Sequence, residues 1–351
     1  MRTARRWITA AALASLTSLA ACRSAAPGSA STRAPASASD PFAEIDYATA
    51  PLPREAKVFL VAGGDDVGNF AAEVVEQRAL WKQVGLRDEE IACYFAKPTR
   101  RAIADDGAQL AALAPLLRGC YPADPATLHA HLRQAARAAP PFLYLFVSSH
   151  GLPPLLRWKA GVDDANELPK HLELRRGEVG RFDRHVIALE GGTGPGLGQV
   201  QAILRAHRAG ATVESLVLTP DTLADALAEL PPTSEAIVVL QACFAGGFIG
   251  RPDDDGPSPL TKLARVTVLA ATSAARPSFG CSPGSSRTYW GGAFNRVLAQ
   301  DLEHAPRRPP ALPWAEIHAR VRFVVETMEL IEGEDPSQPT FFTNVTATAS
   351  E

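Results

Sequence analysis

The sequence predicts an α/β protein in which a mainly parallel central sheet carries helices on both faces. Three short apolar runs are typical of strands that are buried on both sides, and they are 57–62, 142–147 and 236–240. Segments with apolar residues at helical spacing separate these runs, as in 67–84. Strands that alternate with helices are joined by crossover connections, which place successive strands parallel in one sheet.

Proline and capping residues mark the ends of several elements. Pro231-Pro232 ends a helix before the 236–240 strand. At the start of that helix, Thr219 is a suitable N-cap and Pro220 occupies the first turn. The expected strands are 57–62, 90–96, 142–147, 186–189, 213–218, 236–240 and 263–271. The expected helices are 67–84, 105–117, 125–138, 197–209, 220–230, 290–302 and 314–330.

Composition and charge narrow the class of protein. The 351 residues are 46% hydrophobic and 21% charged, which argues against a wholly disordered chain. The formal net charge is −3, and the chain contains no block of five or more basic residues. Nucleic acid is therefore not an expected partner.

The first 21 residues have the pattern of a secretion signal. Three arginines within the first six residues precede an apolar stretch at 7–19 that is too short to span a bilayer. The sequence that follows, Leu-Ala-Ala-Cys at 19–22, resembles the bacterial lipoprotein box, which implies lipidation of Cys22. The alternative is an ordinary signal peptide with an incidental cysteine.

A lipid on Cys22 would anchor the mature protein to a membrane outside the cytoplasm. We expect a location in the bacterial cell envelope, at the outer membrane, facing the periplasm or the surface. Residues 22–55 are rich in Ala, Ser and Pro and predict a flexible tether. The folded domain is expected at 56–345.

Four cysteines remain after Cys22, and they are Cys93, Cys120, Cys243 and Cys281. An oxidising envelope allows disulfides between them. We predict a bond between Cys93 and Cys120, although the sequence does not determine connectivity.

Two residues with reactive side chains each follow an apolar run. His150 comes after the 142–147 strand, and Cys243 comes after the 236–240 strand. The carboxyl ends of parallel strands lie at one edge of a sheet, where α/β proteins bind ligands. A histidine can generate the reactive thiolate of a cysteine, and the backbone N–H groups of Gly151 and Cys243 are candidate oxyanion donors. The alternative is that Cys243 is a buried core residue and His150 is structural.

These strand ends resemble those of a known group of enzymes. The motifs V-S-S-H-G at 147–151 and Q-A-C-F-A-G-G at 241–247 are similar to the His-Gly and Ala-Cys strand ends of caspase-fold cysteine peptidases. Further likenesses point to the legumain family in its bacterial form. They are the segments around Asn69-Phe70, at 270–272, at 278–281, at 288–291 and at 336–339.

The resemblance covers roughly 56–151 and 216–342. Residues 152–215 are unmatched and are interpreted as an insertion. The insertion contains a glycine-rich loop at 191–198 whose spacing fits neither the dinucleotide nor the P-loop fingerprint. We interpret this loop as a connection rather than as a phosphate site.

The resemblance assigns roles to individual residues. It implies that Cys243 is the nucleophile, that His150 is the base and later the acid, and that Asn69 helps to orient His150. Gly151 matches an oxyanion donor, and Gln241 and Ser278 match positions of the substrate pocket. A turn asparagine and a loop serine are the ordinary alternatives for Asn69 and Ser278.

The pocket positions depart from the legumain pattern. Gln241 and Gly292 stand where legumain has acidic residues, and Ala71-Ala72 replace an Arg-His pair. A pocket without those charges need not prefer Asn, so strict cleavage after Asn does not follow.

The resemblance therefore implies a cysteine endopeptidase that acts on peptide or protein substrates, with neither a cofactor nor a metal. The alternatives from other classes are a non-catalytic surface protein of the same fold and a transpeptidase or transamidase that transfers the acyl group to an amine.

Overall fold

The computed structural model describes residue 42 and residues 45–154, 184–189, 197–250, 257–281, 284–304 and 307–345. Cys22, the expected signal peptide and most of the expected tether lie outside the described residues. In the described part of the chain, no helix is long and apolar enough to cross a membrane.

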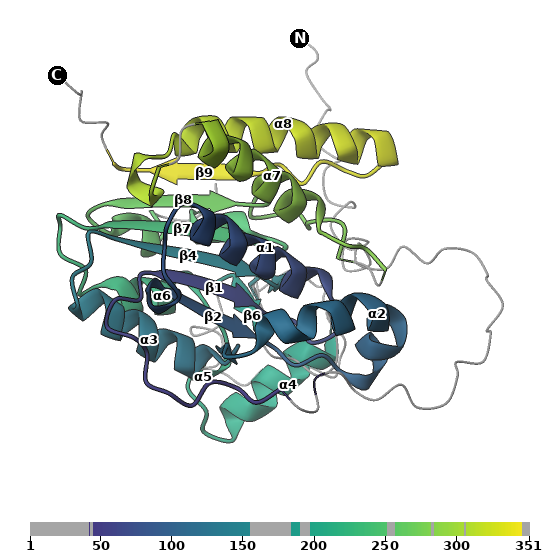
Figure 1. The fold of residues 1–351 in the computed structure, drawn as a ribbon. Coiled ribbons are helices and arrows are strands. Elements are labelled where there is room, and N and C mark those ends of the chain that lie inside the picture. Colours follow the sequence, from purple (N-terminus) through teal and green to yellow (C-terminus); the bar gives the residue numbers. More distant parts are fainter. Residues whose placement is uncertain are drawn as a thin grey trace, which may run out of the picture.

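A seven-stranded sheet with the order β3-β2-β1-β4-β7-β8-β9 forms the centre of the molecule (Figure 1). Its pairings are parallel except for that of β9, which is antiparallel to β8. The strands are β1 (Val58–Ala62), β2 (Ile91–Phe95), β3 (Tyr121–Pro122), β4 (Phe142–Ser148), β7 (Glu235–Gln241), β8 (Val266–Ala270) and β9 (Thr340–Thr343). A second sheet contains β5 (His150–Leu152) and β6 (Val186–Ala188).

Helices cover both faces of the large sheet (Figure 1). One face is covered by α1 (Asn69–Gln83), α2 (Arg100–Leu113), α7 (Tyr289–His304) and α8 (Trp314–Glu332). The other is covered by α3 (Pro125–Arg137) and α6 (Pro220–Leu227). The smaller sheet packs with α4 (Leu197–Arg208) and α5 (Val213–Leu216). The expected fold class is confirmed.

The apolar runs are continuous because both sides of each strand are buried. Val58 and Leu60 of β1 belong to the core beneath α1 and α7, whereas Phe59 and Val61 belong to the core beneath α3 and α6. Successive side chains of a strand point to opposite faces, so a sheet between two helical layers needs an apolar residue at each position.

Side-chain caps start the helices on the second face. The Asp124 carboxylate accepts a hydrogen bond from the Thr127 backbone N–H at 2.8 Å, and Pro125 occupies the first turn of α3. Thr219 caps α6 in the same way, as expected from the sequence. Such caps satisfy N–H groups that have no partner within the helix.

The expected strand at 213–218 is wrong, because Val213–Leu216 form the short helix α5. The Thr212 hydroxyl accepts a hydrogen bond from the Ser215 N–H at 3.3 Å and begins the helical turn. Among the described residues, Leu218 is the one position of this segment that makes a β-bridge, to Ile187 beside the small sheet. The apolar spacing here suits either element, and the local cap decides between them.

The packed body begins before residue 56. Ile45 and Leu52 are buried, and the Ala48 N–H donates a hydrogen bond to the Cys120 carbonyl at 2.9 Å. Residues 45–55, which the sequence assigned to the tether, therefore lie against the folded domain.

The predicted Cys93–Cys120 disulfide is confirmed. Cys93 is a residue of β2, and Cys120 directly precedes β3, so the bond fastens a two-residue edge strand to its neighbour. Closing a loop between residues 27 positions apart restricts the unfolded chain and is worth about 3.5 kcal/mol on the chain-entropy estimate.

We predict that Cys93→Ala, Cys120→Ala and the double variant each lower the free energy of unfolding by about 2 to 4 kcal/mol. Either single change removes the whole bond, so the double variant should lose little more than a single one. Urea unfolding at equilibrium measures all three. Losses that add up in the double variant would contradict the bond.

Candidate active site

The pairing of β4 with β7 brings the two predicted catalytic residues to the same edge of the sheet. Ser148 and Gln241 are partners in the parallel register, and the Ser149 N–H donates to the Gln241 carbonyl at 3.0 Å. His150 and Cys243 each lie two residues beyond that pair. Their alignment therefore follows from the register of two buried strands.

Gly151 confirms that the two strand ends are in contact. A Cβ atom on this residue would lie 1.9 Å from the Cys243 carbonyl oxygen and 3.1 Å from the Ala242 side chain. Any side chain at 151 would push the backbone after His150 away from the backbone of Cys243. The oxyanion role of the Gly151 N–H stays a prediction.

His150 is buried and is held by two contacts. It is 3% exposed, and its Nε2 lies 2.7 Å from Oδ1 of Asp66, in the turn between β1 and α1. Phe70 packs against the His150 ring in an edge-to-face arrangement, with the ring centroids 5.0 Å apart. If Nε2 carries the proton donated to Asp66, Nδ1 is the acceptor nitrogen of the neutral imidazole.

Asp66 is a site residue that the sequence reasoning missed. It follows β1, which lies beside β4 in the sheet with Ala62 paired to Ser148. The sequence did carry a signal for this residue, because Asp65-Asp66 follow a third apolar strand at the same edge of the sheet.

Asn69 has a different partner from the one expected. It is fully buried at the start of α1, and its Nδ2 donates to the Gly280 carbonyl at 2.7 Å. The described structure shows no hydrogen bond between Asn69 and His150. Asn69 instead ties α1 to the loop between β8 and α7, which also carries Ser278.

Cys243 is a free, half-buried thiol in the described part of the chain. Its Sγ accepts a hydrogen bond from the Ser278 N–H at 3.2 Å. The next residue, Phe244, has a φ of 59°, so the chain turns sharply just after the thiol. Burial raises the pKa of Cys243 to about 11, against the smaller opposing effect of the Ser278 hydrogen bond. The thiol is therefore protonated at neutral pH, and a reaction at sulfur needs a base.

The two predicted pocket residues lie together beside the thiol. Gln241 Nε2 donates to Ser278 Oγ at 3.3 Å, and both residues are buried. Ser148 Oγ lies 3.5 Å from Gln241 Oε1. Their contact with substrate stays a prediction, because in this structure the two side chains belong to a buried hydrogen-bond network.

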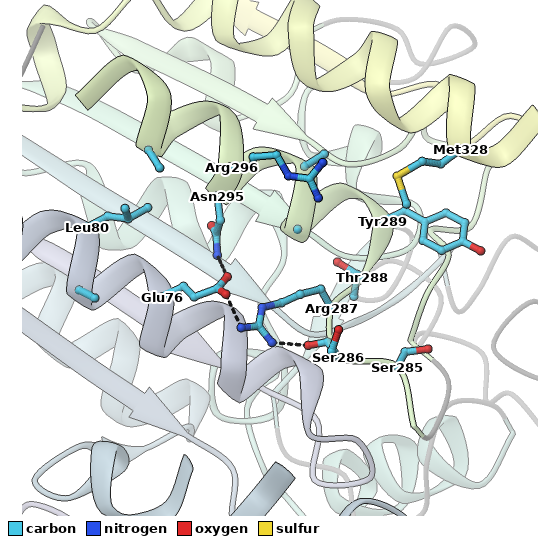
Figure 2. A pocket seen from close by; sticks show the side chains of 14 residues that line it. Glu76, Leu80, Ser285, Ser286, Arg287, Thr288, Tyr289, Asn295, Arg296 and Met328 are labelled. Atoms are coloured by element: carbon cyan, nitrogen blue, oxygen red, sulfur yellow. Dashed lines mark hydrogen bonds and ion pairs between the residues drawn. The ribbon is translucent and has the colours of Figure 1, made fainter. Parts of the chain in front are cut away.

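A cavity of about 640 Å³ lies between α1, α7 and α8 (Figure 2). The Glu76–Arg287 ion pair crosses one wall, and Asn295 donates to Glu76 at 2.9 Å. Gly292, one of the positions that depart from the legumain pattern, contributes to the lining. Neither His150 nor Cys243 lines it. The lining residues are Glu76, Ala79, Leu80, Ser285, Ser286, Arg287, Thr288, Tyr289, Gly292, Ala293, Asn295, Arg296, Ala299 and Met328.

The expected insertion is described only in part. It contains β6, α4 and α5, and β6 pairs antiparallel with β5 so that Ala188 lies opposite His150. The Ser149 hydroxyl donates to the Ala188 carbonyl at 2.6 Å. The insertion thus supports the strand that carries His150. Residues 155–183 and the 191–196 part of the glycine-rich loop lie outside the described residues.

Within the described ranges, no group of three or more His, Cys, Asp or Glu residues is arranged to hold a metal ion.

Comparison with known proteins gives a likeness of structure only. No protein-family model and no curated protein match the sequence. A protein of Geobacter sulfurreducens has a TM-score of 0.44 and 10% identity, over 82% of this chain and 92% of that chain. Caspase-1 of Spodoptera frugiperda has a TM-score of 0.40 and 11% identity, over 86% of this chain and 90% of that chain. A caspase is thus among the similar structures, and no sequence comparison confirms the legumain family.

TM-scores below 0.5 at such identities carry no argument about activity.

We predict that Gly151→Ala displaces His150 from Cys243 and lowers the reactivity of Cys243 towards a thiol-directed peptidyl probe at least tenfold, because the added Cβ overlaps the Cys243 carbonyl. Labelling rates with wild-type protein as reference measure this.

Gly107→Ala is the matched control, since a Cβ at Gly107 meets nothing within 4 Å and the residue lies in α2. This variant should label at the wild-type rate and be slightly more stable. Equal labelling of both variants would contradict the contact between the strand ends.

Proposed function

We propose that this protein is a cysteine endopeptidase that uses Cys243 and His150. The observation that carries the proposal is the shared register of the two residues beyond the Ser148–Gln241 pair, with Gly151 packed on the Cys243 backbone. Three further features support it: a carboxylate on His150, a free thiol, and a backbone N–H directed at the sulfur.

The reaction begins with proton transfer from Cys243 Sγ to His150 Nδ1 as the sulfur attacks the peptide carbonyl carbon. Asp66 holds the opposite nitrogen, so it selects the tautomer and stabilises the imidazolium that forms. The carbonyl oxygen gains the negative charge and is stabilised by backbone N–H groups, for which Gly151 and Cys243 are the candidates.

Collapse of this intermediate breaks the C–N bond. His150 returns its proton to the departing amine, and a thioester remains on Cys243. Water, deprotonated by His150, then attacks the thioester carbon and releases the new carboxylate and the thiol. Burial raises the pKa of the Cys243 thiol, which favours His150 as a general base during attack over a thiolate formed before the substrate binds.

The expected substrates are peptides or proteins outside the cytoplasm. A lipid on Cys22 would hold the enzyme to the membrane there. Gln241 replaces an acidic pocket residue, so we propose no requirement for Asn before the cleaved bond. If an amine replaces water at the thioester, the same first half-reaction gives transpeptidation, and product analysis with added amine separates the two.

We predict that an acyloxymethyl ketone peptide probe labels wild-type protein on Cys243 and leaves Cys243→Ala unlabelled. His150→Ala should label about 10²- to 10⁴-fold more slowly, because the general base is lost. Gel fluorescence and peptide mass mapping measure the rate and the position of the label.

The matched control is His304→Gln, since His304 is exposed at the end of α7 and hydrogen-bonds to the Gln300 carbonyl of the same helix. It should label like wild type. A His150→Ala variant that labels as fast as wild type would show that Cys243 does not depend on His150, and the non-catalytic alternative would then be favoured.

A further inference from the structure

Glu73 is a buried carboxyl group that the proposed mechanism does not use. It lies in α1 and is 0% exposed. Its Oε2 accepts a hydrogen bond from Ser148 Oγ at 2.6 Å, and its Oε1 accepts two from the N–H and hydroxyl of Thr288, each at 2.7 Å. Gly291 closes the space around it, since a Cβ there would lie 2.2 Å from the carboxyl group.

A continuous chain of polar groups leads from this carboxyl group to the thiol. Ser148 Oγ lies 2.6 Å from Glu73 and 3.5 Å from Gln241 Oε1. Gln241 Nε2 donates to Ser278 Oγ, and the Ser278 N–H donates to Cys243 Sγ. The chain joins α1, β4, β7 and the loop after β8. It passes through both predicted pocket residues.

The proton on Glu73 determines which way the Ser148 hydroxyl points. A carboxylate only accepts, so an ionised Glu73 takes the single proton of Ser148 and leaves Gln241 Oε1 without that donor. A protonated Glu73 donates through Oε2 to Ser148, and the Ser148 hydroxyl is then free to donate to Gln241 Oε1. The two Thr288 donors remain on Oε1 in both states. The chain is therefore completely connected only when Glu73 is neutral.

The surroundings allow both protonation states at ordinary pH. Burial raises the pKa of Glu73 to about 7, while the hydrogen bonds from Ser148 and Thr288 and the charge of Arg287 act in the opposite direction. Arg287 is itself paired with Glu76 of α1. The groups bonded to the Glu73 carboxyl from β4 and from the loop before α7 are the uncharged Ser148 and Thr288.

We propose that Glu73 is a positioning residue, whose proton fixes Gln241 and Ser278 around Cys243 and keeps negative charge away from the forming thiolate. This proposal rests on the proposed cysteine peptidase function. Cys243 should be more reactive when Glu73 is neutral. Ionisation of Glu73 should therefore lower the reactivity of Cys243 as the pH rises through about 7, relative to a protein in which residue 73 stays neutral.

Glu73→Gln is the direct test, because a glutamine at this position accepts from Thr288 through oxygen and donates to Ser148 through nitrogen, as the neutral carboxyl group does. The measurement is the rate of Cys243 alkylation by iodoacetamide between pH 5.5 and 8.5, with the site identified by mass mapping. We expect equal rates at pH 5.5, and at pH 8.5 a variant rate about threefold or more above wild type, the range of coupling through a packed network.

A second readout establishes whether Glu73 titrates in the folded protein. Its pKa is 4.5 in the unfolded chain and about 7 when folded, so the neutral form favours folding at low pH, and that contribution is lost as pH rises from about 4.5 through about 7. The Tm of wild type minus that of Glu73→Gln should therefore fall over this interval. A flat difference would overturn the proposal.

The matched control is Glu235→Gln. Glu235 is also buried, with a pKa raised by burial, but it lies at the other end of β7. It should change the pH dependence of Tm without changing the alkylation ratio. If Glu73→Gln does the same, Glu73 titrates but does not act on Cys243, and the proposal is overturned.

If Glu73→Gln does not fold, Ser148→Ala breaks the chain one residue further along. Alkylation of that variant should lack the change near pH 7 that wild type shows, and retention of the change would overturn the proposal. Alkylation needs no peptide substrate, so these outcomes are distinguishable from failure of the peptidase function. If the protein is not a peptidase, peptide cleavage is absent but the ratio of the variant alkylation rate to the wild-type rate still shows whether Glu73 acts on Cys243.

Discussion

The parallel pairing of β4 with β7 is the constraint on which the site depends. Both strands are buried along their whole length, so their register is fixed by packing on two faces and by the backbone ladder. A slip of one residue would turn every apolar side chain of a strand to the opposite core and would separate His150 from Cys243. The alignment of His150 with Cys243 is thus a consequence of how the core packs.

The edge of the sheet then receives residues from several parts of the chain. Asp66 comes from the turn after β1, and Ser278 comes from the loop after β8. Behind them, Glu73 and Gln241 form a buried polar layer in which each hydrogen bond satisfies a group that burial would otherwise destabilise. Such a layer is costly if one member is lost, which makes it suited to holding side chains in one arrangement.

Much of this organisation could be predicted from the sequence, because the strands are continuous apolar runs with clear ends. His150 and Cys243 were chosen as candidates by their place after such runs, and the Cys93–Cys120 bond was predicted correctly. Short elements were harder to predict. The 213–218 segment has the apolar residues of a strand, and its helical form is decided by a single threonine cap.

Side-chain partners could not be predicted from sequence. Asp66 and Asn69 lie three residues apart in one turn region, and the sequence does not say which of them reaches His150; in the structure Asp66 does, and Asn69 turns to Gly280. The contacts of Glu73 with Ser148 and Thr288 span 75 and 215 residues of sequence, so only the folded chain brings them together.

The central claim, that Cys243 and His150 form one reactive centre at these strand ends, is tested most directly by a crystal structure of the protein with a peptide aldehyde. We predict a covalent bond from Cys243 Sγ to the aldehyde carbon, with His150 Nδ1 within hydrogen-bond distance of the adduct and Nε2 still on Asp66. An aldehyde bound without a bond to sulfur, or an adduct with His150 turned away from it, would contradict the account.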